Sequence, residues 1–237
     1  MDDFSLLIDL HKANARQGPG GDTETALALT LTGLDPAQPL AVADIGCGAG
    51  ASTLTLARLL PKAQITAVDF LPEFLEVLGQ QAQHAGLAER ISPLPCAMDD
   101  LPFAAGALDL IWSEGAIYNI GFQTGITAWR PFLKPGGLLV ASEITWTRTD
   151  RPAEIEAHWA TEYPEIDTAA AKIAQLERHG YSPQGYFTLP AACWLDNYYR
   201  PLQAQFSAFL TRHHDSAEAQ AIIAAEQEEI ALYERYG

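Results

Sequence analysis

The chain has 237 residues, 48% of them apolar, which is enough for one globular domain with a buried core, so a disordered chain is not expected. Its 14 Lys and Arg residues stand against 30 Asp and Glu residues and give a formal net charge of −16. Because such a surface repels phosphate backbones and anionic lipid head groups, nucleic acid and membrane surfaces are not expected as partners.

Cysteine usage and the first residues of the chain indicate its compartment. The three cysteines, Cys47, Cys96 and Cys193, lie far apart and show no metal-ligand spacing. The opening Met1-Asp2-Asp3 is acidic where a signal peptide is basic, and no apolar run approaches the ~20 residues of a membrane helix. We therefore expect a cytoplasmic protein without a metal site.

Short apolar runs alternate with helical stretches along much of the chain, which is typical of a parallel α/β sheet. Five strands are predicted, at residues 40–45, 64–68, 91–94, 108–112 and 137–144. Helices between them are predicted at residues 52–60, 72–85 and 123–132. The predicted fold is a Rossmann-like, mostly parallel sheet with helices on both faces.

The segments on either side of this core have a mainly helical period. In chain order they are predicted as helices at 3–15 and from Thr23, an inserted helical lid at 151–168, a helix at 168–179, a sixth strand at 181–189, and helix from 190 to 237.

A glycine-rich loop, Asp44 to Gly50 (Asp-Ile-Gly-Cys-Gly-Ala-Gly), follows the first predicted strand. Glycines let the backbone turn sharply there and approach a ligand beside a helix N-terminus. Asp69 ends the second strand, 19 residues after Gly50, where a carboxylate can accept both hydroxyls of a ribose. Taken alone, Asp69 is more often a helix cap or a solvated strand end than a ligand, but its place among the other motifs favours a ligand role. Asp44 is explained as a residue that organises the loop, a role compatible with ligand binding.

Two further features favour S-adenosylmethionine (SAM) over a nicotinamide dinucleotide. Asp44 directly precedes the glycines, where its carboxylate can lie near an ammonium group. After the third strand, residues 96–103 contain Met98, which can pack on an adenine ring, and Asp99, which can accept from the adenine amino group.

Four segments in chain order then resemble the successive motifs of class I SAM-dependent methyltransferases. They are Asp-Ile-Gly-Cys-Gly-Ala-Gly, Val-Asp-Phe, Met-Asp-Asp-Leu-Pro-Phe and Leu-Lys-Pro-Gly-Gly. The branch most similar is the small-molecule one related to quinone-biosynthesis C-methyltransferases, and the resemblance covers roughly residues 16–145. Residues 16–20, 112–122 and 163–167 also resemble a subgroup of uncharacterised bacterial methyltransferases.

The resemblance implies a SAM site, with S-adenosylhomocysteine as the product. Gly46 and Gly48 would meet the methionine part of SAM, and Asp69 the ribose. The full implied set is Arg16, Gln17, Asp44, Gly46, Gly48, Asp69, Phe70, Met98, Asp99, Glu114 and Gly115. Phe70, Met98 and Asp99 would surround the adenine. Glu114 and Gly115 would line the site near the sulfonium, and Arg16 or Gln17 would meet the SAM carboxylate.

The resemblance further implies methyl transfer to a small-molecule acceptor by direct in-line displacement. Three residues are candidates for a catalytic base, namely Glu114, Tyr118 and Glu143. The sequence does not identify the acceptor. A non-catalytic SAM-binding sensor and a nicotinamide-dependent oxidoreductase remain as alternatives; the second requires a catalytic Tyr-Lys or His pair that is not found in a suitable place.

We expect one methyltransferase domain over residues 1–237, with N-terminal cap helices at 1–33, a cofactor-binding core at 40–145, and a lid and C-terminal helical part at 146–237. The sheet of this family ends on an antiparallel seventh strand after a late helix, and no such strand is predicted here. Either the chain is cut short or its sheet edge is completed differently, and an incomplete edge would favour a homo-oligomer.

Overall fold

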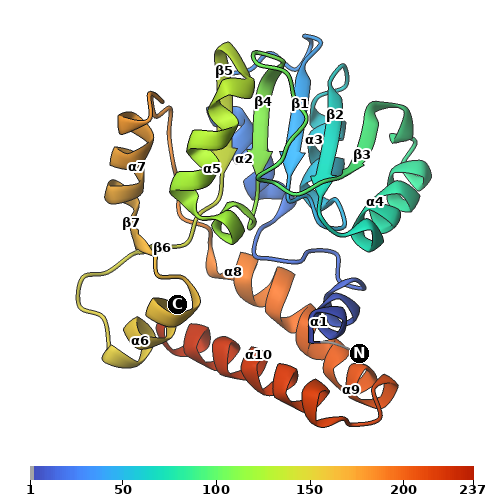
Figure 1. Cartoon of the computed structure of the whole chain (residues 1–237), viewed down its shortest axis with the longest axis vertical. Helices are drawn as coiled ribbons and strands as arrows, with labels where there is room; N and C mark the ends of the chain where they lie inside the picture. The colour runs from blue at the N-terminus through green and yellow to red at the C-terminus, as the bar shows by residue number, and fades with distance from the viewer. Residues whose placement is uncertain (1–2) are drawn as a thin grey trace. The chain divides into compact units, whose positions relative to one another are not determined.

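The computed structural model describes residues 3–237, and its contacts divide the chain into two compact units (Figure 1). The larger unit, Asp22–Thr188, contains every strand, whereas the described part of the smaller unit, Met1–Gly21 with Leu189–Gly237, is helical. The predicted division into cap, core and lid stays a prediction, although the second helix of the expected cap belongs to the sheet unit.

Five parallel strands form the sheet of the larger unit, as the alternation of apolar runs predicts. They are β1 (Ala41–Ile45), β2 (Gln64–Asp69), β3 (Ile91–Pro95), β4 (Leu108–Ser113) and β5 (Leu133–Ala141). Their order is β3-β2-β1-β4-β5. The chain runs outward from β1 to β3 and returns to β4 on the other side of β1, so the order reverses between β1 and β4. Ligands of open α/β sheets bind at such a reversal, outside the carboxyl ends of the strands.

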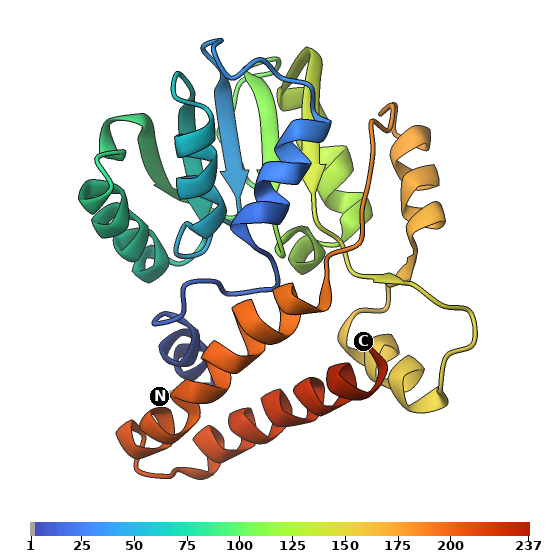
Figure 2. The ribbon, with the colours of Figure 1, turned by 180° about the vertical axis from the view of Figure 1, so that it is seen from behind.

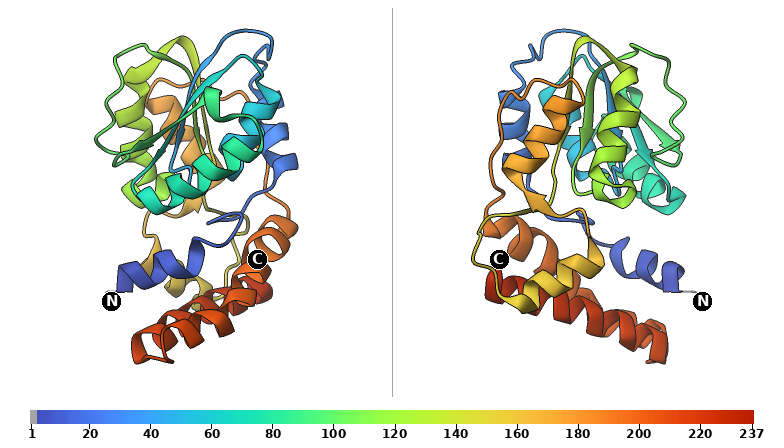
Figure 3. Two further views of the ribbon diagram at one scale, coloured as in Figure 1. Left: turned by 90° about the vertical axis from the view of Figure 1, so that its right-hand side faces the viewer. Right: turned by 60° about the vertical axis from the view of Figure 1, so that its left-hand side comes forward.

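Helices cover both faces of this sheet, which explains why β1 and β4 are almost wholly buried. On one face lie α2 (Asp22–Leu31), α3 (Ala51–Leu59) and α4 (Pro72–His84), and on the other α5 (Phe122–Trp129). Figure 2 shows α2 and α3 from behind, and the edge-on view in Figure 3 places α2 and α5 on opposite faces. The predicted Rossmann-like sheet with helices on both faces is confirmed.

Beyond β5 the larger unit continues with two short paired strands and two helices. They are β6 (Thr145–Trp146), α6 (Ala153–Glu162), β7 (Asp167–Thr168) and α7 (Ala169–Arg178), and β6 pairs with β7 in parallel. Thr168 begins α7 as its N-cap, because its hydroxyl accepts a hydrogen bond from the Ala171 N–H. The helix predicted within residues 151–168 is thus present as α6.

The predicted sixth strand at 181–189 is wrong, since these residues are in no ladder. Pro183 and Gly185 interrupt the segment, and both residue types weaken a strand. Tyr181 instead joins the core beside α5, where its hydroxyl donates to the Ile126 carbonyl at 2.8 Å. The strand β5 also begins four residues earlier than predicted, because it passes through the Pro-Gly-Gly segment with an irregular register opposite Leu108.

The smaller unit packs α1 (Asp3–His11) with α9 (Arg200–Arg212) and α10 (Ala217–Tyr236). Two short helical segments lead into α9, namely α8 (Ala191–Trp194) and η4 (Leu195–Tyr199), so the predicted helical character of 190–237 is confirmed. Asp9 of α1 accepts hydrogen bonds from Arg212 and His213 at the end of α9. Within residues 3–237, no antiparallel strand after a late helix joins the five-stranded sheet. None of the helices in this range has the length and apolar character of a membrane span.

Candidate functional site

The glycine loop lies at the carboxyl end of β1, beside the point where the strand order reverses. The N–H groups of Gly46 and Cys47 both donate to the Val68 carbonyl, at 2.8 and 3.0 Å, and so hold the loop against the end of β2. Gly50 adopts a left-handed conformation with φ 90° and starts α3. The loop therefore presents its backbone at the N-terminus of α3, as the sequence predicts.

Gly46 brings three loops together at this edge. Its φ is 73°, a conformation that L-residues other than glycine rarely adopt. A Cβ atom added at Gly46 would lie 2.2 Å from the Ala116 Cβ, after β4, and 3.3 Å from the Met98 Cε, after β3. The loops that follow β1, β3 and β4 thus meet at a residue that has no room for a side chain.

Asp69 joins the glycine loop to the end of β2. One carboxylate oxygen, Oδ2, accepts from the Gly48 N–H at 2.8 Å, and Oδ1 accepts from the Leu71 N–H at 3.0 Å. Burial raises the pKa of Asp69, and the backbone hydrogen bonds oppose that rise. Asp69 therefore organises the loop, and since each carboxylate oxygen can accept a further hydrogen bond, it can also accept from a ligand.

Asp44 is a fully buried carboxylate in the central strand, with 0% of its surface exposed. The hydroxyls of Ser52 and Thr53, in the first turn of α3, donate to its Oδ2 at 2.9 and 2.6 Å. Its Oδ1 is buried and has no hydrogen-bond partner among residues 3–237. Burial, together with the charges of Glu114 and Asp69, raises the pKa of Asp44 to about 7. A donor, preferably a cation, would satisfy this oxygen.

The raised pKa of Asp44 should make the free energy of unfolding depend on pH. From about pH 3.8 to about pH 7 the folded protein keeps a proton on Asp44 that the unfolded chain has released. The free energy of unfolding should therefore decrease as the pH rises through this range and then level off. Urea unfolding at about pH 5 and about pH 8 measures the decrease, which should be smaller in Asp44→Asn. An identical pH dependence in both proteins would contradict the assignment.

The residues expected around an adenine lie on the β2–β3 side of the loop. The Met98 side chain reaches Gly46, and its carbonyl accepts from the Trp129 indole N–H at 2.7 Å. Asp99 is exposed in the turn that follows β3, and Phe70 is 64% exposed directly after Asp69. The structure thus brings Met98 to the loop and leaves the other two side chains open to solvent.

Glu114 and Gly115 follow β4 on the other side of the loop. The Oε1 atom of Glu114 accepts from the Thr25 hydroxyl at 2.6 Å and from the Trp112 indole N–H at 2.9 Å. The Gly115 N–H donates to the Ser142 hydroxyl at 2.7 Å, which connects the ends of β4 and β5. Thr25 was not predicted as a site residue, because nothing local in the sequence of α2 indicates that its hydroxyl contacts a residue 89 positions later.

The other two candidates for a base differ in their surroundings. Tyr118, in the helical turn η2 (Ile117–Ile120), is 46% exposed and its ring meets the Tyr163 ring edge-on at 6.0 Å. Glu143, just after β5, is buried and forms an ion pair with Lys172 of α7 at 2.6 Å. The predicted catalytic role of Glu114, Tyr118 and Glu143 stays a prediction.

Arg16 and Gln17 belong to the smaller unit. The Gln17 side-chain amide donates to the carbonyls of Asn14 and His11, at 2.9 and 3.3 Å, and so closes the end of α1. Their predicted contact with the SAM carboxylate stays a prediction.

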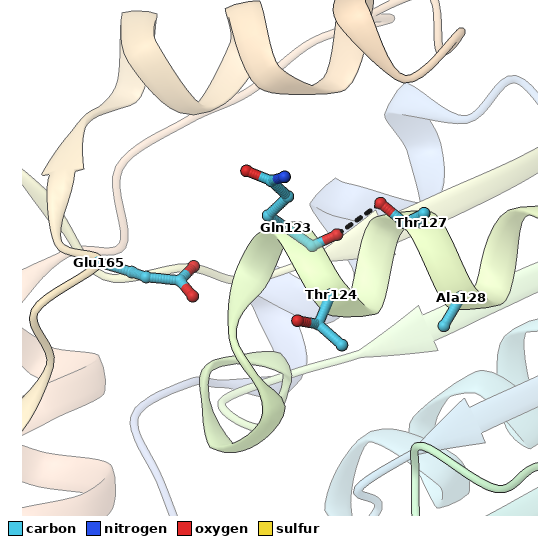
Figure 4. A pocket seen from close by; sticks show the side chains of 5 residues that line it. All are labelled: Gln123, Thr124, Thr127, Ala128 and Glu165. Carbon is cyan, nitrogen blue, oxygen red and sulfur yellow. Dashed lines mark hydrogen bonds between the residues drawn. The ribbon is translucent and has the colours of Figure 1, made fainter.

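A hollow of about 490 Å³ lies along α5 and is open to solvent (Figure 4). Its lining residues are Gln123, Thr124, Thr127, Ala128 and Glu165. None of them is a residue predicted to bind a cofactor. Throughout the described chain, no group of three or more His, Cys, Asp or Glu side chains is placed to hold a metal ion.

Comparisons with known proteins find similarity to methyltransferases. Residues 42–137 match the family model described as a methyltransferase domain. A release factor glutamine methyltransferase from Moorella thermoacetica is 41% identical over 76 residues, which are 32% of this chain and 27% of the relative. A malonyl-[acyl-carrier protein] O-methyltransferase from Herminiimonas arsenicoxydans is 29% identical over 146 residues, 61% of this chain and 53% of the relative.

The fold is shared over nearly the whole chain with a solved structure. A SAM-dependent methyltransferase from Geobacter sulfurreducens, crystallised with S-adenosylhomocysteine, superposes with a TM-score of 0.83 at 19% identity, covering 99% of this chain and 92% of that one. The predicted likeness to methyltransferases is therefore confirmed over residues 42–137, and the chain shares the fold of a SAM-dependent methyltransferase. The chain spans from about a quarter to about half the length of these two curated relatives.

Proposed function

We propose that the chain transfers the methyl group of SAM to a small-molecule acceptor by in-line displacement and releases S-adenosylhomocysteine. The observation that carries this proposal is the buried, unpartnered Oδ1 of Asp44 beside the glycine loop. Burial is the main cause of the raised pKa of Asp44, and the negative charges of Glu114 and Asp69 raise it further. A cationic ligand relieves this repulsion and satisfies the oxygen.

This charge favours SAM over a dinucleotide. SAM carries a sulfonium and an ammonium against one carboxylate, whereas the pyrophosphate of NAD is anionic and would meet carboxylates at the ends of β1, β2 and β4. Because like charges in a buried site repel strongly, the same glycine loop that suits SAM is unfavourable for NAD. The malonyl-[acyl-carrier protein] and release factor relatives are both named as methyltransferases, which supports the reaction class but not one acceptor.

Each group of residues would contribute a different part of the binding. Gly46 and Gly48 allow the backbone to approach the methionine part, and Asp44 attracts the cationic groups. Asp69 accepts hydrogen bonds from the ribose hydroxyls. Met98 packs on the adenine, with the exposed Phe70 and Asp99 beside it. Glu114 and Gly115 line the end of the site where the methyl group of SAM lies. Thr25 and Trp112 hold Glu114 in place.

SAM supplies an already activated methyl group, so the chain mainly has to position the acceptor and exclude water. A base is needed only where the attacking atom loses a proton. We propose Glu114, Tyr118 and Glu143 as the residues from which such a base would come. A cytoplasmic location and a pairing of two copies through an incomplete sheet edge remain proposals as well.

Calorimetry with three ligands tests the cofactor. SAM and S-adenosylhomocysteine are expected to bind and NAD is expected not to, because of the carboxylates around the loop. NAD binding without SAM binding would favour the oxidoreductase.

Methyl transfer from labelled SAM into an extract of small metabolites tests the reaction. We expect labelled products in a size range below that of proteins, and none when SAM is replaced by S-adenosylhomocysteine in the control. Strong SAM binding without any product across broad extracts would favour the non-catalytic sensor.

A further inference from the structure

Three side chains from distant parts of the larger unit form a buried polar cluster next to the proposed site. We call Glu143, Tyr163 and Lys172 the acceptor cluster. The Lys172 ammonium lies 2.6 Å from the Glu143 Oε1, and the Tyr163 hydroxyl donates to the same oxygen at 2.6 Å. Only 4% of the Lys172 side chain and 7% of the Glu143 side chain are exposed. The cluster therefore holds a charge pair almost completely away from water.

Fold stability does not account for this pair. Removing two charges from water is costly, and a buried ion pair is commonly no more stable than apolar residues of similar volume. Lys172 lies 4.9 Å from the Phe122 ring centre and 5.1 Å from that of Tyr163, so an apolar side chain at this position would have ready packing partners. A role in binding would account for a pair that stability alone does not favour.

One atom of the cluster is left unsatisfied. Both donors meet the Oε1 of Glu143, while its Oε2 is buried and has no hydrogen-bond partner in the described chain. A buried carboxylate oxygen without a donor is unfavourable, so native structures rarely leave one unpaired. The Lys172 charge keeps the pair neutral, so the missing partner has to be a hydrogen-bond donor and does not have to be a cation.

The position of Glu143 connects this oxygen with the proposed cofactor site. Glu143 follows β5 by two residues, and the neighbouring Ser142 binds β4 and its loop through the Ser113 carbonyl, at 2.9 Å, and the Gly115 N–H, at 2.7 Å. Tyr118, three residues after Gly115, contacts the Tyr163 ring. The acceptor cluster thus lies on the β4–β5 side of the carboxyl edge, next to the loop proposed to hold the methyl end of SAM.

We propose that Glu143 Oε2 accepts a hydrogen bond from the molecule that is methylated, and that this molecule is small and carries an O–H or N–H donor on an apolar or aromatic body. This inference rests on the proposed function and narrows its acceptor class. Tyr118, Tyr163 and Phe122 supply the aromatic surroundings for such a body. Lys172 and Tyr163 act as positioning residues, because they fix Glu143 Oε1 and so direct Oε2.

The double variant Glu143→Gln/Lys172→Met tests the proposal, since it removes both charges together and leaves no unpaired one. Its melting temperature should equal or exceed that of the unchanged protein. The probes are phenols, alcohols and amines, each paired with its methylated counterpart that lacks the donor. Binding to the protein loaded with S-adenosylhomocysteine is followed by saturation-transfer NMR and calorimetry.

We expect the unchanged protein to bind donor probes more tightly than their methylated counterparts, and the double variant to lose roughly 10- to 100-fold in affinity for the donors. Its affinity for S-adenosylhomocysteine should not change. Tyr163→Phe keeps the ion pair. It should raise KM for a methylated substrate that carries a hydrogen-bond donor, with a smaller effect on kcat. Lys134→Met/Asp109→Asn removes an ion pair at the opposite end of β4 and β5 and should alter neither affinity.

Three results would overturn the proposal: equal donor affinity in the double variant, equal affinity for donor and methylated probes, or no binding of any donor probe. A double variant that unfolds at a lower temperature but keeps its donor affinity would likewise show a purely structural cluster. Failure of the unchanged protein to bind S-adenosylhomocysteine would instead contradict the proposed function, and with it this inference. The two failures are therefore distinguishable.

Discussion

Asp69→Ala is expected to weaken the binding of SAM and S-adenosylhomocysteine by about 1–3 kcal/mol, or about 5- to 150-fold in Kd. The substitution removes the acceptor proposed for the ribose hydroxyls. It also releases the Gly48 N–H, which donates to Asp69 at 2.8 Å, so the loop loses a support at the same time. Calorimetric titration measures the change. Asp69→Asn keeps one acceptor oxygen, so its affinity for the ligand should lie between those of Asp69→Ala and the unchanged protein.

Asp35→Ala provides a matched control for this substitution. Asp35 also accepts from a backbone N–H two residues later, that of Ala37 at 2.9 Å, but it lies in the exposed loop before β1. Its replacement should leave the affinity for S-adenosylhomocysteine unchanged. If Asp69→Ala bound the ligand as tightly as Asp35→Ala does, the ribose assignment would be wrong.

Gly46→Ala should be the most destabilising of these substitutions. The φ of 73° costs about 1–2 kcal/mol for an L-residue. The added methyl would lie 2.2 Å from the Ala116 Cβ, which cannot rotate away, and overpacking of this kind costs about 1–3 kcal/mol. A total of about 2–5 kcal/mol is expected from urea unfolding. Ligand binding should be lost as well, because the loop has to move.

Gly79→Ala is the control for Gly46→Ala. Gly79 lies inside α4 with an ordinary helical conformation, and an added Cβ would meet nothing within 4 Å. This variant should be more stable than the unchanged protein by about 0.5–1 kcal/mol, since alanine loses less conformational freedom in a helix. Similar unfolding midpoints for the two variants would mean that the glycine loop tolerates side chains.

The core of the fold was predictable because its signals are local. Strands β1, β2 and β4 are short apolar runs, each closed by a residue that begins a turn, and the glycine loop and Asp69 follow at their ends. The segment at 181–189 also carries apolar residues, namely Tyr181, Tyr186, Phe187 and Leu189, yet it forms no strand. The conformation of this segment depends on the packing of Tyr181 beside α5. This is a tertiary contact, which the hydrophobic periodicity of the sequence does not reveal.

The same limit applies to the candidate site. Asp44, Asp69 and Glu114 stand at strand ends and were predicted from their positions. Lys172 lies in α7 among residues of a helical surface, and a lysine there is normally exposed. Only the packing of α7 on the segment after β5 reveals that it is 3% exposed and paired with Glu143. Contacts between residues distant in sequence are therefore what the sequence alone could not supply.

The buried Oδ1 of Asp44 has one more consequence. At the pH where this carboxyl titrates, about 7, a proton and the positive end of SAM would compete for the same oxygen. If SAM binds there as proposed, its uptake would also be an acid–base event that releases a proton to the solvent. Proton and cofactor would then compete for one atom, and the affinity for SAM would fall as the pH falls below about 7.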